Sequence, residues 1–280
     1  MRGILFAVVP GGYLLRSRLA GKTARISWFL INPVVIGMAS VWVTAMAFPQ
    51  FMLTFVLAFL AWQSIYEIGY LENDIQTVKR ESAPTLRLSP EVHLALGAQY
   101  GLVVGIKWLV AALLLAVLGW LDAQHVVTLH VVVFAVLLAI TRMAFRAHNT
   151  VRSRTNIATY FALAVLKYAA LPVGFNESES TFWLVVVLCL IFPAVRTIEH
   201  ACKMKYGFPR LARWVGDFHR FRVFYYMVLS VGLGLLTVTA QSSVFMLGAL
   251  ISAYFVVVRA AAYVVSKRRT LEKPEAYRWD

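Results

Sequence analysis

Long apolar segments alternate with short polar ones along the whole chain, and they have the length of membrane-spanning helices. Crossing a bilayer as a helix takes roughly 17–25 predominantly apolar residues. Eight runs of about that length occur, at residues 26–48, 50–71, 96–120, 125–145, 157–175, 180–198, 221–240 and 243–265. The pattern predicts an all-α, polytopic membrane bundle of about eight transmembrane helices and leaves a ninth open.

The two polar ends of the chain complete the predicted organisation. Residues 1–25 mix short apolar stretches with five cations, which predicts a cytoplasmic or interfacial helix and tether rather than a cleavable signal peptide. We expect residues 26–265 to form the transmembrane domain and residues 266–280 to form a basic cytoplasmic tail. We call residues 1–25 the N-terminal segment.

The composition agrees with a membrane protein and limits the kinds of partner that we expect for it. The 280 residues are 60% hydrophobic and have a mean hydropathy of +0.72, which excludes a soluble globular domain. The net charge of +14 is typical of cytoplasmic loops in so apolar a chain, so we expect the membrane and no nucleic acid as its partner. The two cysteines form no CxxC motif, and the sequence predicts no zinc site.

Basic residues fall almost entirely on one side of the predicted membrane. The loops without any Lys or Arg are those at 49, 121–124, 176–179 and 241–242. The other side carries both ends of the chain and the long connections at 72–95, 146–156 and 199–220. By the positive-inside rule, both termini and all the long connections are cytoplasmic. We therefore expect a multi-pass protein of the inner (cytoplasmic) membrane, with its active site facing the cytosol.

The stretch YEIGYLENDIQTVKRESAPTLRL, residues 66–88, places acids at helical spacing where the second span reaches the cytosol. If the helix continues past Tyr70, one face carries Glu67, Tyr70, Asp74, Thr77 and Glu81. Carboxylate and amide oxygens suit Mg²⁺, so we predict that Asn73, Asp74 and Glu81 bind the metal and act in catalysis. The remaining members of this stretch are expected to bind an anionic substrate, and they are Glu67, Tyr70, Thr77, Lys79, Arg80, Thr85 and Arg87.

A second polar constellation ends the sixth span, in FPAVRTIEHACKMKYGFPRLARW. Arg196, Glu199 and Lys203 are three and four residues apart, which places them on one helical face with a basic balance. The connection between the fourth and fifth spans, FRAHNTVRSRTN, adds further candidates for anion binding in His148, Asn149 and Arg152.

Three cations lie within the predicted spans. Lys107 and Lys167 are deep, so each needs an acid such as Glu67 as partner or a substrate anion to hold. Arg259 lies nearer the cytosolic end, where its side chain can snorkel to the membrane surface.

The first constellation carries a resemblance. Asn73-Asp74-x-x-Thr77-x-x-x-Glu81, followed by Pro84-Thr85-x-Arg87, resembles the first aspartate-rich motif of the UbiA superfamily of intramembrane prenyltransferases. That family has Asp where this chain has Thr77 and Glu81, and it has a second acidic motif where this chain has Lys203. In its Asn-Asp, its Pro-Thr and this Lys, the chain is similar to the decaprenyl-phosphate phosphoribosyltransferase branch. The resemblance covers two short motifs and the topology.

That branch implies a Mg²⁺-dependent transfer of a 5-phosphoribosyl group from phosphoribosyl pyrophosphate to a polyprenyl phosphate. The product would be a lipid-linked ribose 5-phosphate, a precursor for envelope or surface polysaccharide. The phosphate nucleophile is already anionic, so catalysis needs positioning and electrostatics rather than a general base. Two alternatives stay open: a prenyltransferase with a prenyl diphosphate donor and a small aromatic acceptor, and a non-enzymatic lipid-phosphate or solute carrier. The sequence also leaves a homo-oligomer open.

Overall fold

The computed structural model of the protein describes residues 4–19, 21–80, 87–151, 153–176 and 181–269. These residues fold into helices and turns, with no strand among them. Eight helical segments in this part of the chain are long and apolar enough to cross a membrane: Lys22–Trp42, Phe48–Thr77, Tyr100–Ala123, Val131–Thr150, Asn156–Phe175, Thr181–Ala201, Phe218–Ala240 and Ser243–Val265. The predicted all-helical membrane architecture is therefore confirmed.

The chain divides into two compact units. The first unit comprises Met1–Arg152 with Ala170–Ser178, and the second unit comprises Ser153–Ala169 with Glu179–Asp280. Helix α9 (Asn156–Phe175) contributes its first part to the second unit and its last turns to the first.

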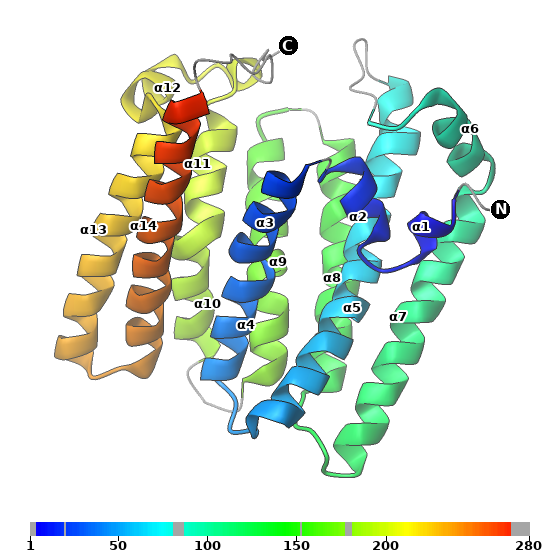
Figure 1. The fold of residues 1–280 in the computed structure, drawn as a ribbon, viewed down its shortest axis with the longest axis horizontal. Helices are drawn as coiled ribbons and strands as arrows, with labels where there is room; N and C mark the ends of the chain where they lie inside the picture. Colours follow the sequence, from blue (N-terminus) through cyan, green and yellow to red (C-terminus); the bar gives the residue numbers. More distant parts are fainter. Residues whose placement is uncertain (1–3, 20, 81–86, 152, 177–180, 270–280) are drawn as a thin grey trace. The chain divides into compact units, whose positions relative to one another are not determined.

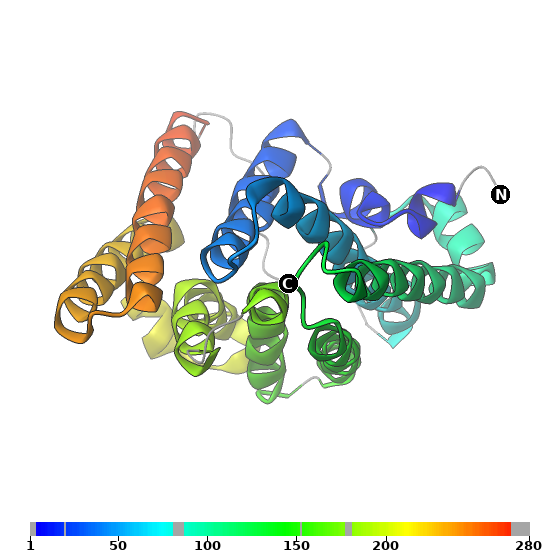
Figure 2. The ribbon, with the colours of Figure 1, turned by 90° about the horizontal axis from the view of Figure 1, so that it is seen from below.

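Helix α5 (Phe48–Glu72) is the centre of the first unit. It packs against α4 (Pro33–Trp42), which follows α3 (Lys22–Ile31), and against α7 (Tyr100–Ala123) and α8 (Val131–Thr150), as Figures 1 and 2 show. Rings at spacings of three or four residues stack along one side of α5, at Phe48, Phe51, Phe55, Phe59, Trp62, Tyr66 and Tyr70.

Helices α5 and α8 approach each other most closely at Gly69. The ring of Phe145 in α8 lies so near that a Cβ atom at Gly69 would be 2.1 Å from it. Asn149, one turn further along α8, donates a hydrogen bond from Nδ2 to the Gly69 carbonyl oxygen at 3.0 Å. Because Gly69 has no side chain, the ring and the amide can both reach the backbone of α5 at this point.

The α-helical geometry of α5 ends at Glu72, but the chain stays helical for eight more residues. A π-helical turn, η1 (Asn73–Thr77), and a 3₁₀ turn, η2 (Val78–Arg80), follow directly. Such π turns are common at functional sites, because they change the direction in which successive side chains project. The prediction that Glu67, Tyr70, Asp74 and Thr77 lie on one face of a continuous α-helix is therefore corrected from Asn73 onward.

The N-terminal segment packs into the first unit. Helix α2 (Gly12–Ser17) lies against α5, and α1 (Leu5–Val8) lies against α7 (Figure 1). The buried cluster that joins these elements to η1, α6 (Pro90–Ala98) and α7 consists of Ile4, Ala7, Tyr13, Leu71, Ile75, Leu96 and Val103. Apolar burial therefore fixes this segment onto the end of α5.

In the second unit, α10 (Thr181–Cys189), η3 (Leu190–Ala194) and α11 (Val195–Ala201) form one helical run, with a π turn around Pro193. Helices α13 (Phe218–Ala240) and α14 (Ser243–Arg269) form a hairpin (Figure 1). Two short elements connect α11 to α13: the 3₁₀ turn η4 (Met204–Tyr206) and helix α12 (Pro209–Val215).

The predicted spans agree with the observed helices except near some ends. The fourth span is shifted at both ends and runs from Val131 to Thr150 rather than from 125 to 145, because Gln124–His130 form a non-helical connection with His125 in the left-handed region. The predicted connection 146–156 is largely helix, since α8 continues to Thr150 and α9 begins at Asn156. His148 and Asn149 therefore lie on a helix rather than in a loop.

Candidate functional site

Asp74 is the centre of a buried polar cluster at the C-terminal end of α5. Its Oδ1 atom accepts hydrogen bonds from Arg18 Nη2 (2.8 Å), Arg87 Nη1 (3.0 Å) and Asn73 Nδ2 (3.1 Å). Its Oδ2 atom accepts one from the Tyr13 hydroxyl (2.8 Å). We call these five residues the Asp74 cluster. Two guanidinium groups on one carboxylate leave the cluster with an excess of positive charge.

Arg18 has one N–H donor in this cluster that no described residue accepts. Its Nε atom is buried and has no hydrogen-bond partner among the described residues, and its guanidinium lies over the Tyr70 ring at 4.8 Å from the centroid. Burial lowers the pKa of Arg18, against an opposing effect of Asp74, but an arginine stays charged at neutral pH. A buried, charged donor of this kind is costly unless an anion satisfies it.

Tyr13 serves the cluster as a hydrogen-bond donor. Burial, and then the charge of Asp74, raise the pKa of Tyr13 far above its usual value. The hydroxyl therefore remains protonated at any physiological pH and donates to Asp74.

Glu67, about two helical turns before Asp74, contacts the N-terminal segment. Its carboxylate accepts hydrogen bonds from the backbone amides of Gly11 (3.1 Å) and Leu14 (2.7 Å), at the start of α2. Gly11 has φ of +84°, a left-handed conformation that favours glycine. Lys107 Nζ completes the shell at 2.6 Å from Glu67 Oε2.

Glu67 and Lys107 are both fully buried. Of the two partners considered for Lys107, the structure therefore shows the acid. Their side chains are enclosed by one another and by α2, and their predicted contact with a substrate stays a prediction. Their role here is to bring Tyr13 and Arg18 to Asp74.

The other predicted residues of the first unit occupy different positions. Tyr70 borders the Asp74 cluster, Thr77 is buried in η1, and Lys79 is exposed on η2. Asn149 is buried and bonds to Gly69, and His148 is half-buried on α8. Glu81, Thr85 and Arg152 lie outside the described residues, as does the side chain of Arg80.

The predicted Mg²⁺ ligands are Asn73, Asp74 and Glu81. Asn73 and Asp74 supply the described oxygens, while Glu81 is outside the described part of the chain. Among the described residues there is no group of three or more His, Cys, Asp or Glu side chains that could hold a metal ion. Oδ1 of Asp74 already accepts three hydrogen bonds, two of them from cations. As described, these residues do not fit a Mg²⁺ ion bound directly by Asp74.

In the second unit, Glu199 on α11 is contacted by two arginines. Arg196, one turn earlier, pairs with Oε2 of Glu199. Arg222 on α13 reaches both oxygens, with Nε 2.5 Å from Oε1 and Nη2 2.9 Å from Oε2. We call Arg196, Glu199 and Arg222 the Glu199 cluster. Arg196 and Glu199 lie on one helical face, as their spacing predicts, and Arg222 was not predicted.

Lys203 does not share the face of Arg196 and Glu199. Helix α11 ends at Ala201, and Lys203 has extended backbone angles before η4. Its side chain is half-buried and lines a cavity of about 170 Å³ with Cys202, Met204, Ala212, Gly216 and Phe218. Burial, and then the charges of Lys205 and Arg196, lower the pKa of Lys203.

Lys167 on α9 is half-buried and lies close enough to Arg196 for their charges to repel each other. Its amino group is 5.9 Å from the centroid of the adjacent Tyr168 ring. Lys167 therefore lies near the Glu199 cluster, and its predicted contact with an anion stays a prediction.

A buried network next to α11 has a structural explanation. The Tyr206 hydroxyl lies 2.6 Å from Asn156 Oδ1 and 2.7 Å from His200 Nε2, and the two latter atoms are 3.1 Å apart. The ring of Tyr160 stacks on His200, with centroids 4.1 Å apart. Arg154 Nε donates to the Tyr206 carbonyl oxygen at 2.9 Å. These mutually satisfied groups join the start of α9 to α11 and η4.

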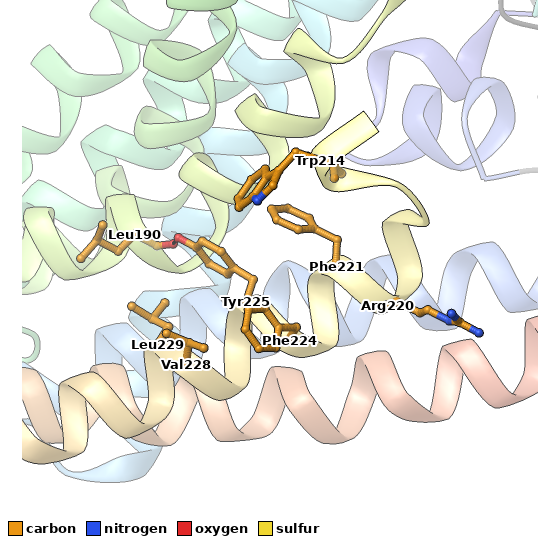
Figure 3. A pocket seen from close by; sticks show the side chains of 9 residues that line it. Leu190, Trp214, Arg220, Phe221, Phe224, Tyr225, Val228 and Leu229 are labelled. Atoms are coloured by element: carbon orange, nitrogen blue, oxygen red, sulfur yellow. Dashed lines mark hydrogen bonds between the residues drawn. The ribbon is translucent and has the colours of Figure 1, made fainter. Parts of the chain in front are cut away.

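An apolar groove of about 580 Å³ lies along α12 and α13 (Figure 3). Trp214, Phe221 and Tyr225 form its aromatic part, and Tyr225 donates a hydrogen bond to the Leu190 carbonyl oxygen at 2.5 Å. Arg220 is its one charged lining residue, and Figure 3 shows its guanidinium pointing away from the other labelled side chains. The described residues that line this groove include no member of the Glu199 cluster, and nearly all of them are apolar or aromatic.

Sequence reasoning missed the roles of Tyr13, Arg18, Arg142 and Arg222. Arg142 lies 2.8 Å from Glu72, without the alignment of a hydrogen bond, and so makes an ion pair only. The positive-inside rule accounts for every arginine near a predicted cytosolic loop. The sequence therefore offers no reason to single out the arginines that contact an acid. The one available signal was the presence of buried acids at Glu67 and Asp74, which require partners.

Comparisons of the chain with protein-family models, with curated proteins and with solved structures find no match. The function therefore has to be argued from the residues of this chain.

Proposed function

We propose that the protein transfers a 5-phosphoribosyl group from phosphoribosyl pyrophosphate to a polyprenyl phosphate, on the cytosolic side of the inner membrane. The product would be a lipid-linked ribose 5-phosphate for envelope or surface polysaccharide. The observation that carries this proposal is the Asp74 cluster, in which one carboxylate orients Arg18 and Arg87. Guanidinium groups held in this way are suited to bind a pyrophosphate group.

The geometry of the cluster favours a phosphate ligand over a purely structural role. Arg18 retains its buried Nε donor, and the Arg87 side chain is 33% exposed, so both have N–H groups left for a ligand. Asp74 keeps the two arginines from moving apart. Its charge is smaller than theirs, so the cluster attracts an anion.

The second unit contains a cationic cluster of its own. In the Glu199 cluster two arginines contact one carboxylate, and Lys167 and Lys203 are near Arg196. Phosphoribosyl transfer involves phosphate groups besides the pyrophosphate, on the sugar and on the lipid, whereas prenyl transfer to an aromatic acceptor involves none. The non-enzymatic carrier remains the third possibility.

In the proposed reaction, an anionic oxygen of the polyprenyl phosphate attacks C1 of the ribose. The bond between C1 and the pyrophosphate oxygen breaks, and pyrophosphate leaves with the bonding electron pair. Arg18 and Arg87 stabilise the charge that develops on the leaving group. Tyr13 and Asn73 hold Asp74, and Asp74 holds the two arginines. Mg²⁺, which the resemblance implies, belongs to the proposal as the counter-ion that the pyrophosphate donor brings with it.

The test is a transfer assay with purified protein in lipid nanodiscs, Mg²⁺, labelled phosphoribosyl pyrophosphate and farnesyl phosphate as a short polyprenyl phosphate. We expect label in the lipid fraction, and a rate about 100-fold lower for Arg18→Gln, because one donor to the leaving group is lost. Arg16→Gln is the matched control, since Arg16 is an exposed residue of the same helix that lies over Phe6 rather than on Asp74.

Two outcomes would count against the proposal. Wild-type protein that is folded but leaves the lipid unlabelled excludes phosphoribosyl transfer. Transfer from a labelled prenyl diphosphate to an aromatic acceptor, in a parallel arm, would instead establish the prenyltransferase. Equal rates for Arg18→Gln and Arg16→Gln would show that the Asp74 cluster does not bind the leaving group.

A further inference from the structure

Arg259 on α14 lies beside the Glu199 cluster, and sequence reasoning had expected it to snorkel to the membrane surface. Instead it is buried, with 8% of the residue exposed. It is close enough to Arg196, Arg222 and Glu199 for their charges to act on it. Its Nε atom is buried without a hydrogen-bond partner among the described residues, and its guanidinium lies 5.7 Å from the centroid of the Phe255 ring.

The carboxylates available to these arginines are few. The described residues of the second unit contain two acids, Glu199 and Asp217. Asp217 caps helix α13, where its Oδ1 atom accepts the backbone amide of Arg220 at 2.8 Å. Glu199 is already contacted by Arg196 and Arg222. Two arginines therefore contact this carboxylate and a third, Arg259, lies near it, and three positive charges with one negative leave a net charge of +2.

We propose that Arg196, Arg222 and Arg259 form a binding site for a phosphate monoester dianion, with Glu199 orienting two of the three guanidinium groups. The dianion would neutralise the net charge of the site and accept a hydrogen bond from the buried Arg259 Nε. This inference rests on the proposed function, because that reaction offers two phosphate monoesters: the 5-phosphate of the sugar donor and the phosphate of the lipid acceptor.

A structural role alone does not account for Arg259. A buried arginine is stable when its donors are satisfied, as those of Arg222 are by both oxygens of Glu199. Arg259 has its Nε donor unsatisfied, is near two like charges, and is a membrane-helix residue for which an apolar side chain would be less costly. An anion between the three arginines removes all three costs at once.

The experiment measures equilibrium binding of three probes to purified protein in nanodiscs, in the absence of phosphoribosyl pyrophosphate. The probes are ribose 5-phosphate, its methyl phosphodiester, and farnesyl phosphate. We expect ribose 5-phosphate, farnesyl phosphate or both to bind wild-type protein, and the singly charged diester to bind more weakly than ribose 5-phosphate. In Arg259→Gln the affinity for the bound monoester should fall about 10- to 100-fold, the effect of one charge-assisted hydrogen bond.

Two further variants complete the design. Arg259→Lys keeps the charge and should recover part of the affinity. Arg213→Gln removes an exposed arginine of α12 outside the site and should bind as the wild type does. Thermal unfolding of each variant reports whether it is folded. If Arg259→Gln does not fold, the comparison of monoester with diester on wild-type protein still decides whether the site prefers a dianion.

The probes also distinguish the source of the phosphate. Binding of ribose 5-phosphate that depends on Arg259 assigns the site to the sugar donor, and binding of farnesyl phosphate alone assigns it to the lipid acceptor. The proposal is overturned if neither monoester binds, if Arg259→Gln binds them as tightly as wild type, or if the diester binds equally well. Because transfer is not measured here, monoester binding by a protein that labels no lipid retains this site and rejects only the proposed reaction.

Discussion

The Asp74 and Glu199 clusters contain the same charged groups at their centres, but different elements of the fold supply their arginines. Each has one buried carboxylate contacted by two arginines. The arginines of Glu199 lie on membrane helices, one turn away on α11 and across on α13. Those of Asp74 come from the N-terminal segment and from residue 87, just before α6. The Glu199 cluster is therefore built into the helical bundle, whereas the Asp74 cluster is assembled by docking.

This difference predicts how each carboxylate contributes. Arg196 and Arg222 are placed by their helices, so they would stay close together if Glu199 lost its charge. Arg18 is placed by contacts that Asp74 and Glu67 make with the N-terminal segment. Asp74 is therefore needed to bring its arginines together, while Glu199 mainly limits the mutual repulsion of arginines that are already in place.

The largest expected effect compares Asp74→Asn with Glu199→Gln in the transfer assay. Asp74→Asn should lower the transfer rate about 100-fold or more, because Arg18 and Arg87 lose the charge that orients them. Glu199→Gln should lower it less than about 10-fold, since helices hold Arg196 and Arg222. Expression and the topology of the spans should be unchanged in both. Equal losses in the two variants would mean that the two clusters do not differ in the way that their construction suggests.

The second prediction concerns the docking itself. Glu67→Gln removes the charge that binds Gly11, Leu14 and Lys107, and leaves Lys107 buried without its acid. Backbone amides at residues 11–18 should then exchange hydrogen about 10- to 100-fold faster, as expected for the loss of a charge-assisted hydrogen bond. The measurement is amide hydrogen exchange followed by mass spectrometry.

The control for docking is Glu72→Gln, which removes an acid on the same helix that pairs with Arg142 instead of the N-terminal segment. It should leave exchange at residues 11–18 unchanged. If Glu67→Gln also leaves that exchange unchanged, the segment is held by apolar packing alone, and the contrast between a docked and a built-in cluster fails.

The sequence was sufficient for the fold because the apolar runs needed for spanning a membrane are long and continuous. All eight predicted spans overlap observed helices, and the differences are near their ends, such as at Gln124–His130, where Val126, Val127 and Leu129 continue the apolar pattern outside the helix. The break in α-helical geometry after Glu72 could not be seen, since Asn73–Thr77 has no Pro or Gly to mark it. Its cause is tertiary: contacts with α2, α6 and α8 surround it.

The sequence predicted the acids of the site better than their partners. Asp74, Arg196 and Glu199 were singled out because helical spacing brings residues three or four apart together, and Arg87 because it is a basic residue flanking the acids. Arg18 and Arg222 were not, because their acids lie 56 and 23 residues away. Contacts at that separation depend on how helices pack, and local periodicity carries no information about them.

The smallest expected effect uses Lys203 as a reporter of the excess positive charge near the Glu199 cluster. Burial, and then Lys205 and Arg196, lower the pKa of Lys203 in the folded protein, whereas in the unfolded chain it is about 10.4. Between these two values the unfolded chain binds a proton that the folded protein lacks. The free energy of unfolding should therefore rise with pH across that window. Below the window Lys203 adds no slope, because it is protonated in both states and its full destabilising effect is present.

Thermal unfolding at a series of pH values up to about 10.4 measures this slope. Lys203→Met should abolish the contribution, and Lys205→Met should reduce it, because one of the charges that lower the pKa is gone. A saturating phosphate monoester should reduce it as well, since an anion at Arg196 offsets the repulsion that Lys203 feels. If wild type and Lys203→Met have the same slope, Lys203 does not sense the cationic cluster. The positive charge of the Glu199 cluster would then be no greater than that of the Asp74 cluster, and the phosphate monoester would have to bind elsewhere.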